Sequence, residues 1–214
     1  MSIPAHSHFS LVATHNKARP LNIGIIGFGR FGHFIAKSFA KHAHVIGTSR
    51  TDYTEMANEI GVKFIPLSNL ESFVVDEDLD VIVLAVSIVS FEDTVKDLVP
   101  HIHKRMEVKG KDSCPLIVDV ASVKEHPRGI LLEHLPEECD ICCTHPMFGP
   151  DSARDGWQGQ TFVYEKTRIN GMLLEPVNET GDDGGEDTFF DGHHQYNDHI
   201  ELSEGVDRME RFLR

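Results

Sequence analysis

The sequence lacks long apolar runs and is poor in cysteine. No stretch approaches the roughly 20 continuous apolar residues that a membrane-spanning helix needs. The four cysteines in 214 residues are too few and too clustered for a disulfide scaffold. They are Cys114, Cys139, Cys142 and Cys143, and the last three resemble only half of a metal site. We therefore expect no membrane association, no bound metal and a reducing compartment.

Positive charge is missing from residues 169–207, which hold eleven Asp and Glu and no Lys or Arg. This segment accounts for most of the net charge of −14, so the rest of the chain is almost balanced. An acidic chain is unsuited to neutralising nucleic-acid phosphates. The segment is also rich in Gly, His and Asn, as solvated loops are. We predict an acidic flexible insert at residues 170–205 and no nucleic-acid partner.

The remaining length suits one domain with short flanking segments, since 40% of the residues are hydrophobic and can form a core. Residues 1–20 contain Ser, Thr, Lys and Arg but no acid, as transit peptides do, and have no apolar core of a secretory signal. They are predicted to be a disordered lead-in, and the protein is expected in the cytoplasm or the plastid stroma. Residues 206–214 have helical spacing and predict the start of a helical region that is cut short.

Between residues 21 and 169, short apolar runs alternate with amphipathic stretches. The runs predict strands at residues 21–26, 44–47, 63–66, 80–86, 116–120, 140–144 and 161–164. The stretches between them predict helices at residues 31–39, 52–60, 91–99 and 128–134. This alternation is typical of an α/β fold with a doubly wound parallel sheet of the Rossmann type.

A glycine-rich motif follows the first expected strand and precedes the first expected helix. Its G-x-G-x-x-G residues are Gly27, Phe28, Gly29, Arg30, Phe31 and Gly32. The glycines allow a tight turn, close approach of the backbone to a pyrophosphate and close packing of helix on strand. The diphosphate would bind the free N–H groups at the helix N-terminus. The alternative is a glycine-rich turn without a ligand.

The end of the second expected strand indicates which dinucleotide is bound. NAD-binding proteins carry an acid there for the ribose 2′-OH, whereas an Arg accommodates the 2′-phosphate of NADP. Here no acid precedes Asp52, and Ser49, Arg50 and Thr51 offer hydroxyls and a forked guanidinium. NADP is therefore predicted, although Arg50 on a merely exposed turn is the alternative. Ser87, after the fourth strand, completes the candidate cofactor site.

Two further segments leave strand ends at the edge where doubly wound folds bind ligands. They are residues 119–125 and residues 144–152. His145 directly follows a strand and is a candidate base, because its reference pKa of about 6.5 lets it accept a proton near neutral pH. A structural histidine that bonds the backbone is the alternative.

Five motifs resemble the prephenate/arogenate dehydrogenase family, most closely its plant-type NADP-dependent arogenate dehydrogenases. They are GFGRFG, TSRTDY, SVKEHP, CTHPMFGPDS and FVYEKTRI, in this order. The resemblance covers residues 21–169, resumes at residues 208–213 and places the family's domain at about residues 21–214. It implies oxidative decarboxylation of arogenate or prephenate in tyrosine biosynthesis.

The resemblance also assigns roles to single residues. His145 matches the histidine that takes the proton of the ring hydroxyl, and Ser122 matches the serine that orients that hydroxyl. Asp151, which is also included in the catalytic set, stands where relatives carry Glu, and Arg30 stands where plant relatives carry Asn. Relatives continue into a helical domain that dimerises and binds the substrate's carboxylates, and this chain is expected to lack it. The cations left for that task are Lys124, Arg154, Lys166 and Arg168, of which Lys124 is included in the catalytic set.

The leading hypothesis is thus an NADP-dependent arogenate or prephenate dehydrogenase, for which the resemblance implies a homodimer. A truncated homologue that binds NADP without turnover is the first alternative. A different Rossmann reductase, for imines or short hydroxyacids, is the second.

Overall fold

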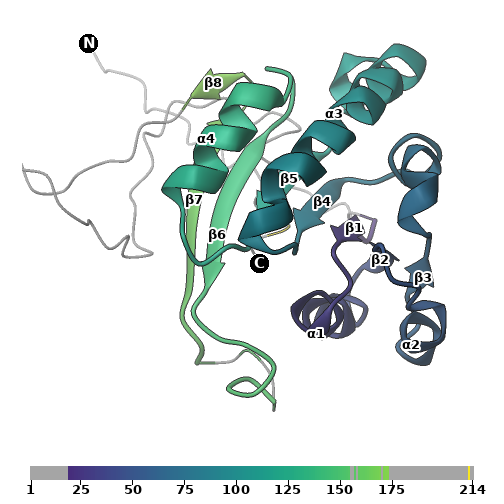
Figure 1. Cartoon of the computed structure of the whole chain (residues 1–214), viewed down its shortest axis with the longest axis vertical. Helices are drawn as coiled ribbons and strands as arrows, with labels where there is room; N and C mark the ends of the chain where they lie inside the picture. The colour runs from purple at the N-terminus through teal and green to yellow at the C-terminus, as the bar shows by residue number, and fades with distance from the viewer. Residues whose placement is uncertain (1–18, 155–156, 158, 170, 174–211, 213–214) are drawn as a thin grey trace, which may run out of the picture.

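The structure is a computed structural model of the chain that describes residues 19–154, 157, 159–169, 171–173 and 212. Its centre is an eight-stranded sheet with the strand order β3-β2-β1-β4-β5-β6-β7-β8 (Figure 1). The strands are β1 (Asn22–Ile26), β2 (His44–Thr48), β3 (Lys63–Phe64), β4 (Val81–Leu84), β5 (Leu116–Asp119), β6 (Ile141–Pro146), β7 (Phe162–Ile169) and β8 (Met172–Leu173). Strands β1 to β6 are parallel, whereas β7 and β8 are antiparallel additions.

The chain runs outward from β1 to β3 and then returns to β4 on the other side of β1. This change of direction makes the sheet doubly wound, so the predicted fold class is confirmed. The α-helices are α1 (Arg30–Phe39), α2 (Thr54–Glu59), α3 (Ile88–Lys109) and α4 (Glu125–His134). Short helical turns are η1 (Leu67–Asn69), the π-helix η2 (Ser72–Asp76) and η3 (Lys111–Ser113).

Helices cover both faces of the sheet, which explains why the central strands are apolar at nearly every position. All four residues of β4 are buried, as are those of β5. Helices α3 and α4 pack with η2 on one face, and α1 and α2 pack on the other (Figure 1). The alternating side chains of each strand therefore enter two separate cores.

Buried Arg105 joins α3 to the segments that lead into β4 and β5. Its guanidinium donates hydrogen bonds to four backbone carbonyls, those of Val74, Glu77, Leu79 and Ser113, at 2.6–3.0 Å. These bonds satisfy carbonyls at the end of the π-helix and beside the strands. They explain why an arginine is tolerated at only 4% exposure.

The parallel strands are in register at their carboxyl ends. Thr48, Ile26, Leu84, Asp119 and Cys143 lie opposite one another across five neighbouring strands. The residues that follow this row all leave the sheet at one edge, the carboxyl edge. The predicted cofactor-binding and catalytic residues all follow this row by at most eight residues, whereas the candidate cations Arg154, Lys166 and Arg168 do not.

Several elements differ from the sequence expectation. Helix α3 has 22 residues, with Pro100 inside it, where a much shorter helix was predicted. Strand β7 is longer than expected, and β8 lies within the predicted insert, where Met172 pairs with Ile169. Residues 170 and 174–205 of that insert lie outside the described residues, as do residues 1–18.

The cysteines also differ from the expectation. Cys114 and Cys139, two residues before β5 and β6, form a disulfide, which the expectation of a reducing compartment did not foresee. Cys142 and Cys143 are buried thiols, and burial raises the pKa of both. No metal-binding cluster occurs among the described residues. No helix in this part of the chain is long and apolar enough to cross a membrane.

Candidate dinucleotide and catalytic site

The glycine-rich turn between β1 and α1 is tightly closed. Gly27 has a φ of +99°, and its N–H donates to the carbonyl of Thr48 at 2.9 Å. A Cβ at Gly32 would lie 1.9 Å from the carbonyl oxygen of Gly27, so helix and turn can approach only with glycine there. A Cβ at Gly29 would meet nothing within 4 Å. The backbone beside the start of α1 is therefore open, as an anion site requires.

The aromatic residues of the motif support the turn from within. Phe28 is fully buried, and its ring lies over Gly47, where a Cβ would come within 2.4 Å of it. It also packs against Tyr53 and Phe64. Half-buried Phe31 packs against Phe34. The Phe28 side chain is thus a core residue, and its backbone is the part that can approach a dinucleotide.

Residues Ser49, Arg50 and Thr51 continue directly from β2 at the carboxyl edge, and Arg50 and Thr51 are exposed. The nearby acid, Asp52, accepts hydrogen bonds from the N–H and the hydroxyl of Thr54, at 2.9 and 2.6 Å. These bonds lower the pKa of Asp52 and fix its carboxylate at the start of α2. The Asp52 carboxylate is therefore already hydrogen-bonded to Thr54, whereas Arg50 has no ion pair within the described residues.

Ser87 caps the beginning of α3, next to the point where the sheet reverses direction. It is exposed, and its hydroxyl lies 3.2 Å from that of Ser90. Because β1 and β4 are neighbours, Ser87 and the glycine turn leave the sheet from adjacent strands. The predicted cofactor residues thus come from three neighbouring strand ends.

A charged cluster joins the ends of β5 and β6. The ammonium of Lys124 donates to Oδ1 of Asp119 and to the carbonyl oxygen of Thr144, the latter at 2.5 Å. The Thr144 hydroxyl donates to the carbonyl oxygen of Asp119 at 2.6 Å. The N–H of Ala121 donates to Oδ1 of the same aspartate at 2.9 Å. Asp119 was not selected from the sequence, although its place at a strand end, five residues before Lys124, was the available signal.

His145 follows this cluster on β6 and is half-buried. Its pKa is lowered from the ordinary value, first by burial and then by the positive charge of Lys124, while Asp119 acts in the opposite direction. The lowered pKa favours the neutral imidazole, the form that can accept a proton. Ser122 is exposed in the connection that follows β5 and has no hydrogen bond within the described residues.

Arg30 and Asp151, assigned to different tasks from the sequence, form an ion pair. Nη2 of Arg30 lies 2.6 and 2.7 Å from the two carboxylate oxygens of Asp151, and both side chains are exposed. Arg154 lies 3.8 Å from the same carboxylate. The pair connects the start of α1 to the segment after β6, next to the glycine-rich turn.

Two of the four candidate substrate cations are buried within the protein. Buried Arg168 donates to the carbonyls of Leu135, Pro136 and Cys139, at the opposite edge of the sheet. Burial lowers its pKa. Lys166 is buried within β7, opposite Cys142. The assignment of Arg168 as a cation near the site is therefore wrong, whereas Lys124 and Arg154 lie at the carboxyl edge.

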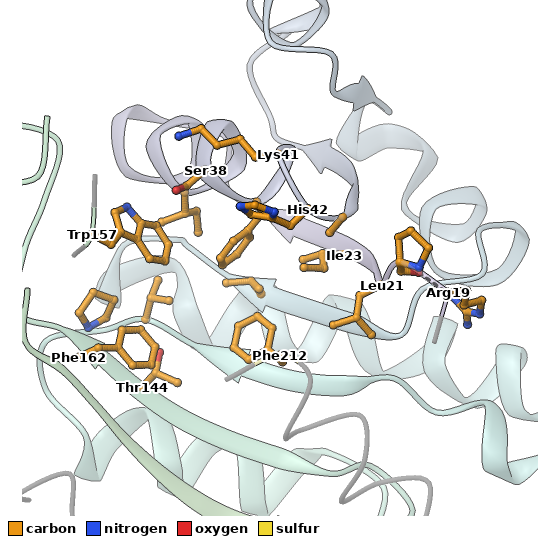
Figure 2. A pocket seen from close by; sticks show the side chains of 17 residues that line it. Arg19, Leu21, Ile23, Ser38, Lys41, His42, Thr144, Trp157, Phe162 and Phe212 are labelled. Atoms are coloured by element: carbon orange, nitrogen blue, oxygen red, sulfur yellow. Dashed lines mark hydrogen bonds between the residues drawn. The ribbon is translucent and has the colours of Figure 1, made fainter. Parts of the chain in front are cut away.

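An aromatic groove of about 690 Å³ lies beside α1 on the face of the sheet that this helix covers. Figure 2 shows Trp157, Phe162 and Phe212 around it. Trp157 packs against Phe39 at 5.5 Å and also contacts Phe34 and Phe148. Trp157 is a packing residue. The groove is lined by none of the six glycine-motif residues, so it is separate from the candidate dinucleotide site.

Comparison with known proteins decides the family. Residues 35–168 match the nucleotide-binding domain of prephenate dehydrogenase. The chain belongs to the prephenate dehydrogenase family. Membership through the nucleotide-binding domain of a dehydrogenase indicates a nicotinamide dinucleotide as the cofactor.

Two curated relatives come from Arabidopsis thaliana, and the chain matches only part of the length of each. Chloroplastic arogenate dehydrogenase 1 is 43% identical over 155 residues, which are 72% of this chain and 22% of that protein. Chloroplastic arogenate dehydrogenase 2 is 40% identical over 160 residues, which are 74% and 42%. This member of the prephenate dehydrogenase family thus spans less than half of either relative.

A solved structure supports the fold alone. It is described as an NADP oxidoreductase of Bacteroides fragilis and superposes with a TM-score of 0.50 at 19% identity. The match covers 68% of this chain and 51% of that one. The Rossmann-type architecture of the family therefore extends across proteins of low sequence identity.

Proposed function

We propose that the chain binds NADP and supports the oxidative decarboxylation of arogenate or prephenate, with His145 as the proton acceptor. The observation that carries the proposal is a neutral, half-buried imidazole at the same sheet edge as an open glycine turn. The family and the named activity of its Arabidopsis relatives supply the reaction class.

The residues at the carboxyl edge are suited to a dinucleotide with an additional phosphate. The turn from Gly27 to Gly32 offers backbone N–H groups to a diphosphate, and Arg30 adds a cation beside it. Arg50, with the hydroxyls of Ser49 and Thr51, is proposed to bind the 2′-phosphate, and Ser87 to line the site near the nicotinamide. Bound there, NADP would supply the acceptor for a hydride.

His145 and Ser122 would act on the substrate's ring hydroxyl. Ser122 would orient the hydroxyl by a hydrogen bond, and a ring nitrogen of His145 would take its proton as hydride leaves the same carbon. Loss of the ring carboxyl as CO₂ then makes the ring aromatic, so the enzyme mainly has to align donor and acceptor.

The test combines cofactor binding with turnover. Purified 214-residue chain is titrated with NADP and with NAD, and NADPH formation is followed by absorbance with arogenate and with prephenate. We expect tighter binding of NADP and NADPH formation with at least one substrate. Preferential binding of NAD would contradict the role of Arg50, and NADP binding without turnover would contradict catalysis by this chain.

A binding module without turnover is the second candidate, favoured by the shortage of cations. The ring carboxylate needs a paired positive charge in a partly buried site. Arg168 is engaged elsewhere, and Lys124 is paired with Asp119. The same titrations separate the two candidates. A plastid location is a further proposal, suggested by the word chloroplastic in the relatives' names, and a fluorescent fusion tests it. Dimer formation is another proposal, and light scattering tests it.

A further inference from the structure

The ion pair between Lys124 and Asp119 has an unusual position. Asp119 is fully buried at the last residue of β5, whereas Lys124 lies just before α4 and its side chain is 21% exposed. The lysine therefore reaches back over the connection that contains Ser122. Its second acceptor, the carbonyl of Thr144, belongs to the neighbouring strand β6.

The pair is hydrogen-bonded to the backbone beside both candidate catalytic residues. Ser122 lies between Ala121, whose N–H bonds Asp119, and Lys124 itself. His145 directly follows Thr144, which accepts a hydrogen bond from Lys124 and donates one to the Asp119 carbonyl. A shift of the ammonium would thus disturb the backbone on both sides of the site.

We propose that Lys124 and Asp119 are positioning residues that hold the Ser122 connection and the His145 strand end in one fixed arrangement. The proposal rests on the proposed function, because it assigns His145 and Ser122 to catalysis. It replaces the earlier assignment of Lys124 to direct contact with the substrate.

Burial argues against a substrate-binding role for Lys124. To bind a carboxylate of the substrate, the ammonium would have to weaken its bond to Asp119. That carboxylate is fully buried, and its second oxygen already has no hydrogen-bond partner in the described structure. Leaving a buried charge uncompensated is strongly unfavourable. The lysine is therefore committed to the protein.

The pair also determines the electrostatic surroundings of His145. Lys124 and Asp119 are the charged groups that act on the imidazole, with opposite signs. On β7, the residue opposite His145 is Val163, which has no charge. Removing the cation should raise the pKa of His145, and removing the carboxylate should lower it. Opposite changes from two contacting residues are a signature that general loosening of the fold would not produce.

The experiment measures the His145 titration by NMR in the full 214-residue chain without cofactor, with the signal assigned by its loss in His145→Gln. We expect a higher pKa in Lys124→Met and a lower one in Asp119→Asn. Lys124→Arg, which keeps the charge, should restore most of the wild-type value. Lys96→Met is the control, because it removes an exposed lysine paired with Glu92 on α3.

Circular dichroism confirms that each variant is folded, and Lys124→Gln replaces Lys124→Met if the latter is not. An unchanged or lowered pKa in the uncharged Lys124 variant would overturn the inference. The titration needs neither cofactor nor turnover, so it stays informative if NADP fails to bind and the proposed function fails. Where NADPH is formed, the Lys124 variant should lose kcat with little change in KM. A large rise in KM alone would instead indicate direct substrate contact.

Discussion

The two edges of the sheet use positive charge in different ways. At the amino edge, Arg105 donates to four backbone carbonyls and Arg168 to three, and both are buried. Beside them, Arg19 pairs with Asp80. At the carboxyl edge, Arg50 has no such partners within the described residues, and Arg30 contacts one exposed carboxylate.

This difference separates cations that stabilise the fold from cations that can bind a ligand. A buried guanidinium that donates to three or four backbone carbonyls is fixed within the fold and is not exposed to a phosphate or a carboxylate of a ligand. An exposed guanidinium with a single weak partner keeps that capacity. Substitutions at the two edges should therefore affect different measurements: catalysis or binding at the carboxyl edge, and stability at the amino edge.

The largest effect is expected for His145→Asn at the carboxyl edge. Loss of the proton acceptor should reduce NADPH formation by roughly 10²- to 10⁴-fold, the usual contribution of general base catalysis. The Kd for NADP should change by less than about twofold, since the imidazole is not assigned to the cofactor. Loss of NADP binding would instead indicate a structural histidine.

The pH profile of the wild type provides a check on the same residue. Activity should fall on the acid side as His145 becomes protonated and can no longer accept a proton. Because the pKa of His145 is lowered from 6.5, this fall should occur below pH 6.5. An acid limb centred above that value would contradict the assignment.

The next effect, at the amino edge, concerns stability. Arg105→Met removes four hydrogen bonds and leaves buried carbonyls without donors, which should lower the free energy of unfolding by about 3 kcal/mol. Lys104→Met is a matched control, because the neighbouring Lys104 forms an exposed pair with Glu71. Lys104→Met should lower the free energy of unfolding by less than about 1 kcal/mol. Urea denaturation measures the free energy of unfolding of both variants, and equal losses would refute the stabilising role of buried Arg105.

The sequence predicted the elements that depend on local pattern. The glycine turn, the apolar strands and the residues after each strand follow from short-range periodicity, and their common edge follows from parallel pairing. The assignment of Arg168 failed because β7 is antiparallel, which places its last residues at the amino edge. The bond from Lys124 to Asp119 depends on how α4 begins, and such side-chain directions are not encoded in spacing alone.

A smaller effect is expected for Arg50→Gln. Loss of a charge-assisted hydrogen bond to the 2′-phosphate should raise the Kd for NADP by about tenfold. The Kd for NAD, which has no such phosphate, should stay within about twofold. Lys111→Gln, at an exposed pair with Glu138 near the amino edge, is the control and should change neither value. Equal increases in the Kd values for NADP and NAD would show that Arg50 does not discriminate between the two dinucleotides.

The smallest effect concerns the exposed pair between Arg30 and Asp151. Asp151 holds the guanidinium that is proposed to bind the diphosphate, so the carboxylate competes with the cofactor for Arg30. Exposed pairs contribute at most about 1 kcal/mol, so Asp151→Asn should lower the Kd for NADP by about two- to fivefold. Arg30→Gln should raise it, and in the double variant the Asp151 substitution should have no further effect. The decrease in Kd caused by Asp151→Asn should be smaller at high salt, because exposed charges are screened. A higher Kd for NADP in Asp151→Asn would mean that the pair instead holds the segment after β6 in the position that binding requires.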